Sequence, residues 1–64
     1  MEPYQIRVVE EKKELDQKLL RLRKFFEGKN FQLVEPDEQA RMRRQEVIMT
    51  DYSNILAERI NAFT

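Results

Sequence analysis

Three arginines near the start of the second predicted helix are well suited to bind an anion. Arg41, Arg43 and Arg44 each offer paired N–H donors that match the oxygens of a phosphate, and the nearby helix N-terminus adds backbone donors. Cations at this end of a helix oppose its dipole, which costs about 0.3–1 kcal/mol each. The arginines therefore form either a phosphate site or a solvated face with local ion pairs.

A second set of polar residues falls at heptad positions where a seam between helices is usually apolar. If Val8 and Leu15 are taken as position a of the first helix, and Met42 and Met49 as position a of the second, position d is mostly polar. Hydrogen bonds between these residues would fix the helix register, which is the preferred interpretation, and the alternative is a polar pocket between helices or protomers. A hairpin would pair Tyr4 with Arg59, Glu11 with Tyr52, and Lys18 with Gln45.

Proline and glycine predict the two helices that would position these residues. No helix breaker lies between Tyr4 and Glu27, and Pro3 suits a first helical turn. Gly28 is expected to end the first helix in the left-handed conformation, and Pro36 to open the second. The prediction is an all-α chain with one domain over residues 1–64, helices at about 4–27 and 36–62, and a packed loop at 28–35.

Both predicted helices carry apolar stripes that are broader than one helix–helix contact can cover. Val9 and Leu20 in the first helix, and Val47 and Ile55 in the second, would stay exposed in a monomer. Full burial of such a side chain contributes about 1.5–3 kcal/mol, and 64 residues are few for a self-sufficient core. We therefore expect the antiparallel two-helix hairpin to assemble into a homo-oligomeric helical bundle, most simply a dimer of four helices.

Composition argues against several classes of protein. The chain has no Cys and no His, which removes thiolate metal sites and the commonest general base, so we expect no enzyme, no metal site and no cofactor. Lys plus Arg and Asp plus Glu number 12 each, giving zero net charge, which disfavours nucleic acid as a partner. No apolar run of membrane length and no signal-peptide pattern is present, so the expected location is the cytoplasm.

Residues of both predicted helices match the pattern of a known group of proteins. They are 4–11 and 14–18 in the first helix, and Arg44-Gln45, Met49, Tyr52, Ile55-Leu56 and Arg59-Ile60 in the second. With these residues the chain resembles a family of small tailed-phage proteins described as crAss-phage-related. The resemblance covers nearly the whole chain and implies a phage or prophage origin, with the host-cell cytoplasm as the location. The hairpin layout is also similar to that of phage sponge proteins, which sequester the cyclic nucleotide signals of bacterial immunity.

The likeness to sponge proteins implies a non-enzymatic protein that sequesters a phosphate-bearing small molecule in a pocket between protomers. The leading candidate for this molecule is a cyclic nucleotide. Its arginines would contact phosphates, its tyrosines would contact bases, and Lys18 and Gln45 would complete the polar wall. The main alternative is a helical interaction module of phage origin that docks onto a host defence protein or a phage protein. The implied ligand-binding residues are Tyr4, Lys18, Arg41, Arg44, Gln45, Tyr52 and Arg59.

Overall fold

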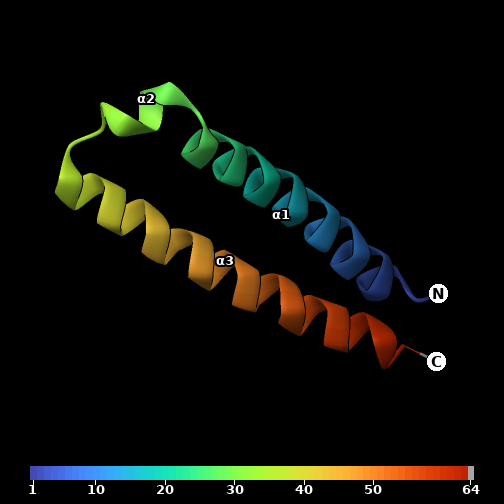
Figure 1. Ribbon diagram of the computed structural model, residues 1–64. Coiled ribbons are helices and arrows are strands. Elements are labelled where there is room, and N and C mark those ends of the chain that lie inside the picture. The colour runs from blue at the N-terminus through green and yellow to red at the C-terminus, as the bar shows by residue number, and fades with distance from the viewer. Residues whose placement is uncertain (64) are drawn as a thin grey trace.

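Two long helices lie side by side and antiparallel, so that both chain ends meet at one end of the molecule (Figure 1). In the computed structural model, which describes residues 1–63, α1 spans Pro3–Glu27, α2 spans Lys29–Gln32 and α3 spans Pro36–Asn61. The molecule is a rod of 46 × 15 × 14 Å. The prediction of an all-helical chain built on a helix pair is confirmed. Within residues 1–63, no helix combines the length and the apolar character needed to cross a bilayer.

Local sequence signals set the starts of both long helices. A proline occupies the first turn of each, where its missing N–H costs nothing. The Glu2 N–H donates to Gln5 Oε1 at 2.8 Å, and the Glu38 N–H donates to the Glu35 carboxylate at 3.2 Å. These bonds satisfy backbone groups that a helix start leaves unpaired. Both helices consequently begin and end within one residue of their predicted bounds.

The connection between the long helices differs from the prediction. Gly28 ends α1 with φ −88° and ψ 165°, which is extended backbone, so the expected left-handed cap is wrong. The Gly28 N–H instead closes the last turn on the Phe25 carbonyl at 3.1 Å. The chain then forms α2, one short helix inside the stretch predicted as a loop. α2 buries Phe31 against the hairpin end and leaves Leu33 exposed.

The seam between α1 and α3 is a heptad stripe whose phase differs from the predicted one. Val8 and Leu15 belong to both phases and pack with Leu56. From Val8, however, the seam continues four residues on, to Lys12, and not three residues on, to Glu11. The seam residues are all buried or half-buried, and they lie at positions 8, 12, 15, 19, 22 and 26 of α1 and at 39, 42, 46, 49, 53, 56, 60 and 63, along α3 and just beyond it.

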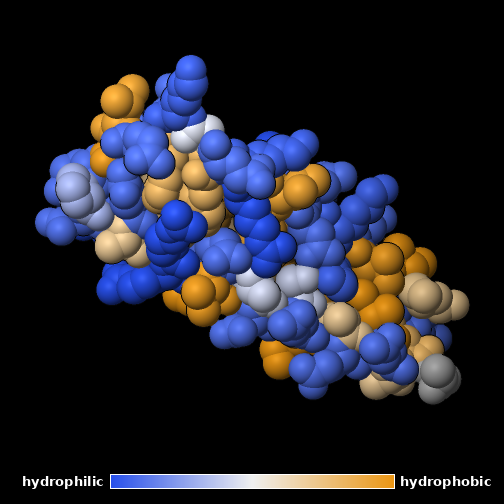
Figure 2. Space-filling model, viewed as in Figure 1, coloured by the Kyte–Doolittle hydropathy of each residue, from blue (hydrophilic) through white to orange (hydrophobic). Residues whose placement is uncertain are grey.

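A single hairpin leaves much of its apolar surface uncovered. Leu20, Val47 and Ile55 are 55%, 56% and 53% exposed, and Val9 is 37% exposed. The prediction that these four side chains stay exposed in one chain is therefore confirmed. In Figure 2 hydrophobic patches emerge between hydrophilic side chains along the visible face of the rod. The prediction of an oligomer rests on this surface.

Candidate functional site

The hairpin has two long flanks, one on either side of the seam. On the first, which we call the polar flank, Lys12 and Asp16 of α1 hydrogen-bond to Ser53 of α3. On the second, which we call the tyrosine flank, the Tyr4 ring packs edge-on against the Phe63 ring, with 5.8 Å between their centroids. Each residue turns the helix by about 100°, so residues one heptad apart lie on nearly the same flank.

The polar flank contains a buried serine between two charged side chains. Lys12 Nζ donates to Ser53 Oγ at 2.8 Å and to Asp16 Oδ2 at 2.9 Å, while Ser53 Oγ donates to Asp16 Oδ1 at 2.5 Å. The hydrogen bond from Ser53, followed by that from Lys12, lowers the pKa of the Asp16 carboxyl below its ordinary value. Ser53 is only 7% exposed, so its hydroxyl is not available to a substrate. The three residues, which we call the polar layer, fix the register of the two helices.

A second polar contact crosses the same flank nearer the hairpin tip. Arg23 donates from Nε to Glu46 Oε2 at 3.0 Å and from Nη2 to Thr50 Oγ1 at 2.9 Å. The predicted seam phase leaves out both this contact and the polar layer. The signal that would have found them is Leu19, whose four-residue spacing from Leu15 continues the seam on the Lys12 side.

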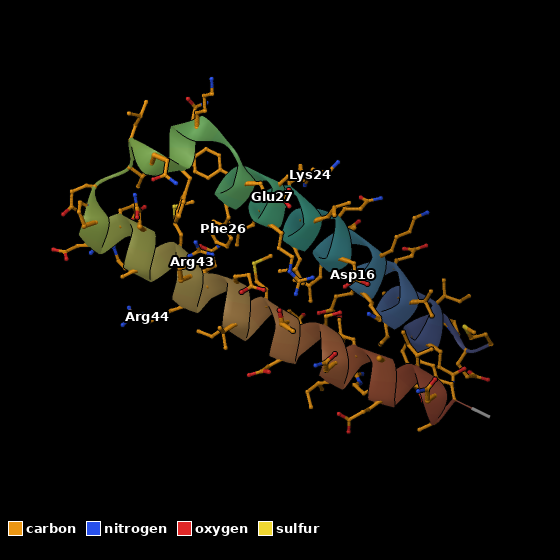
Figure 3. The ribbon with its side chains drawn as sticks, viewed as in Figure 1. Asp16, Lys24, Phe26, Glu27, Arg43 and Arg44 are labelled. Atoms are coloured by element: carbon orange, nitrogen blue, oxygen red, sulfur yellow. The ribbon has the colours of Figure 1, made fainter. Side chains whose placement is uncertain are left out.

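Two of the three predicted phosphate-binding arginines already have partners within the hairpin. The Arg43 guanidinium lies 4.4 Å from the centroid of the Phe26 ring and 4.9 Å from that of Phe31, so it holds the hairpin tip by cation–π contacts. Arg41 Nε donates to Glu38 Oε1 at 2.7 Å, in an exposed pair. Arg44 points away from α1 (Figure 3). The three side chains therefore do not converge on one site within a single chain.

Most of the predicted ligand-binding residues share the tyrosine flank. Tyr4 lies there through its contact with Phe63, and Lys18 lies two heptads farther along α1. Arg59 lies one turn before Phe63, and Tyr52 and Gln45 precede it at heptad intervals along α3. All seven predicted residues are exposed, with Tyr4 at 49% and Tyr52 at 42%.

The predicted register pairs do not hydrogen-bond. Within residues 1–63, no side-chain hydrogen bond joins Tyr4 to Arg59, Glu11 to Tyr52 or Lys18 to Gln45. Gln45 instead directs its amide at the Met49 sulfur, 3.7 Å away. The physical reason is the seam phase, because these residues flank the interface and do not fill it. Their polar groups are consequently free to meet a ligand or another chain.

No pocket is enclosed by the part of the chain that the structure describes. Within residues 1–63, every buried side-chain donor or acceptor has a hydrogen-bond partner. The predicted ligand-binding residues lie on the surface of the hairpin, where the tyrosine flank gathers Arg59, Lys18, Tyr4 and Tyr52.

Comparison with known proteins gives a family. No curated protein and no solved structure matches the chain. A family model described as Sequestin matches residues 2–62, which includes α1, α2, α3 and both flanks. The chain therefore belongs to the Sequestin family.

Proposed function

We propose that the protein is a non-enzymatic binding protein that sequesters a phosphate-bearing small molecule, a cyclic nucleotide of bacterial immune signalling. The family name points to a sequestering role. The likeness to phage sponge proteins favours an immune nucleotide as the ligand and a phage-encoded protein acting in the host cytoplasm. On the tyrosine flank, Arg59 supplies paired donors for phosphate, and Tyr4 and Tyr52 supply rings for bases. Arg41 and Arg44 add exposed guanidinium groups on the same helix as Arg59.

The observation that carries the proposal is the tyrosine flank, which gathers Arg59, Lys18, Tyr4 and Tyr52 on exposed surface of a single hairpin. Small-molecule sites bury most of their ligand in a concavity, and residues 1–63 form none. The same hairpin leaves Leu20, Val47 and Ile55 more than half exposed. A second copy that covers apolar surface would also supply the missing wall of a pocket, so we place the site between protomers.

A second candidate function is a helical module that binds a host defence protein or a phage protein. The exposed apolar side chains favour it, because a contiguous apolar face often marks a protein interface. In this case the arginines would only set the orientation of docking.

Calorimetric titration against a panel of cyclic dinucleotides and cyclic trinucleotides tests the proposal. We expect micromolar or tighter binding to one member, and at least tenfold weaker binding by Arg44→Ala and Arg59→Ala variants. The matched control is Arg21→Ala, which removes an exposed arginine of α1. Absence of binding to every member by a folded protein would contradict sequestration, and capture of one defined host or phage protein would then favour the interaction module.

A further inference from the structure

Glu11 is a half-buried carboxylate on the tyrosine flank that has no partner within the hairpin. It lies one heptad after Tyr4 and one heptad before Lys18 on α1, which places the three side chains on the same flank. Its neighbour Glu10 is exposed, whereas Glu11 is half-buried. Within residues 1–63, the Glu11 carboxylate makes no side-chain hydrogen bond and no ion pair. Its oxygens can therefore accept N–H or O–H donors from a bound molecule.

The core contacts place Glu11 level with Leu56 of α3 along the rod. Val8 and Leu15, which lie on either side of Glu11 in the sequence, both pack with Leu56. The polar layer gives the same level. The midpoint of its two α1 residues lies three residues after Glu11, and Ser53 lies three residues before Leu56 on the antiparallel helix.

Along α3, Glu11 consequently lies between an aromatic ring and a guanidinium group. Tyr52 comes four residues before Leu56 and Arg59 three residues after it, which is about 6 Å and about 4.5 Å along the helix axis. Both side chains are exposed on the tyrosine flank. In every nucleotide the sugar joins the base to the phosphate. A nucleotide that stacks its base on Tyr52 and binds its phosphate to Arg59 would therefore place its sugar beside Glu11.

A carboxylate is suited to bind a sugar and unsuited to bind a phosphate. Carboxylate oxygens accept hydrogen bonds from ribose hydroxyl groups, as they do in dinucleotide-binding folds, whereas they repel the negative charge of a phosphate. Among the flank positions 4, 11, 18, 45, 52 and 59, Glu11 is the one acidic residue. A ligand can therefore lie along the flank in one direction only, with its sugar at the carboxylate and its phosphate at a cation.

We propose that Glu11 is a specificity-determining residue that accepts a hydrogen bond from a ribose hydroxyl group of the bound nucleotide. The protein then selects ribonucleotides over their 2′-deoxy counterparts. The inference rests on the proposed function and deepens it, because it names the sugar as a recognised part of the ligand.

Calorimetric titration with a panel of cyclic dinucleotides and cyclic trinucleotides, each paired with its 2′-deoxy counterpart, tests the inference. Loss of a hydrogen bond to a charged group weakens binding roughly tenfold to a hundredfold, so we expect the wild-type protein to prefer the ribonucleotide by that factor. Glu11→Ala should make the two affinities equal, and Glu11→Gln, whose amide oxygen still accepts, should keep a reduced preference. The matched control is Glu10→Ala, which removes an exposed carboxylate of the same helix and should keep the full preference.

The ratio of the two affinities is the readout, because a change in net charge or in helix stability alters both affinities alike. Equal binding of both ligands by the wild-type protein overturns the role of Glu11 and leaves nucleotide sequestration standing. A full preference in a Glu11→Ala variant with wild-type helical circular dichroism does the same. If Glu11→Ala does not fold, an unchanged preference in Glu11→Gln overturns the inference instead. A wild-type protein that binds no cyclic nucleotide contradicts both the inference and the proposed function.

Discussion

Replacement of Asp16 by Asn should destabilise the hairpin at neutral pH and have little effect in acid. The Asp16 carboxylate accepts hydrogen bonds from Ser53 at 2.5 Å and from Lys12 at 2.9 Å. A buried hydrogen bond to a charged group contributes about 1.5–3 kcal/mol, but the Asp16 side chain is 45% exposed, so we expect a total loss of about 1 kcal/mol. In a chain of this size, that loss lowers Tm by about 4–8 °C.

The pH dependence follows from the direction of the pKa shift. The Ser53 and Lys12 hydrogen bonds hold the pKa of Asp16 below its ordinary value of 3.8. Since the folded-state pKa is the lower one, the stabilisation is fully present above about pH 4 and is lost as the pH falls through the folded-state pKa. The difference between wild type and Asp16→Asn should therefore shrink toward zero in strong acid.

Urea unfolding followed by circular dichroism, at about pH 7 and about pH 2.5 and at one chain concentration, measures this difference. Asp51→Asn is the matched control, since it removes the same charge from an exposed position of α3. Equal free energies of unfolding for wild type and Asp16→Asn at neutral pH would refute the stabilising role of the polar layer. A difference that persists unchanged in acid would refute its ionic origin.

Three further changes have expected outcomes. Leu56→Ala removes the most buried side chain, 1% exposed, and should lower the free energy of unfolding in urea by about 2–5 kcal/mol, whereas Leu33→Ala, at 82% exposed, should change it by less than about 0.5 kcal/mol. Arg43→Ala should cost about 0.5–2 kcal/mol and speed amide exchange at the hairpin tip, and Arg43→Lys should recover only part because Lys lacks the planar guanidinium. Gly28→Ala should raise the free energy of unfolding by about 0.4–1 kcal/mol, and with it Tm. The reason is that the φ of Gly28 is negative and the new Cβ would lie 3.6 Å from the Phe25 carbonyl oxygen, an ordinary contact distance. A clear loss of stability would contradict the extended conformation of Gly28.

The long helices could be predicted from the sequence because their signals are local. A proline at each start, the absence of breakers within each helix, and Gly28 at the end of α1 determine the bounds to within one residue. That some apolar side chains stay exposed in a single chain could also be predicted, because a contact between two helices covers only one stripe of each. α2 could not, since four residues are too few to show a helical period.

The seam phase could not be settled from the count of apolar residues alone. Val8 and Leu15 fit a seam that continues through Glu11 as well as one that continues through Lys12, and among the apolar residues the spacing of Leu19 from Leu15 favours the second. The pairing of Lys12 and Asp16 with Ser53 decides it, and this is a tertiary contact between residues that are individually polar. Because the seam continues through Lys12, most of the predicted ligand-binding residues lie on an exposed flank and not in a buried seam.

The central claim is that the hairpin needs a second copy to cover its apolar surface and complete its binding site. Light scattering of the purified wild-type protein at micromolar concentration tests this directly, with Ile55→Glu, at an exposed apolar position of α3, compared with Asn54→Glu, at an exposed polar position of the same helix. We predict a mass of at least two 7.8 kDa chains for wild type and Asn54→Glu, and a reduced mass for Ile55→Glu. A cooperatively folded wild-type monomer of 7.8 kDa would contradict the claim.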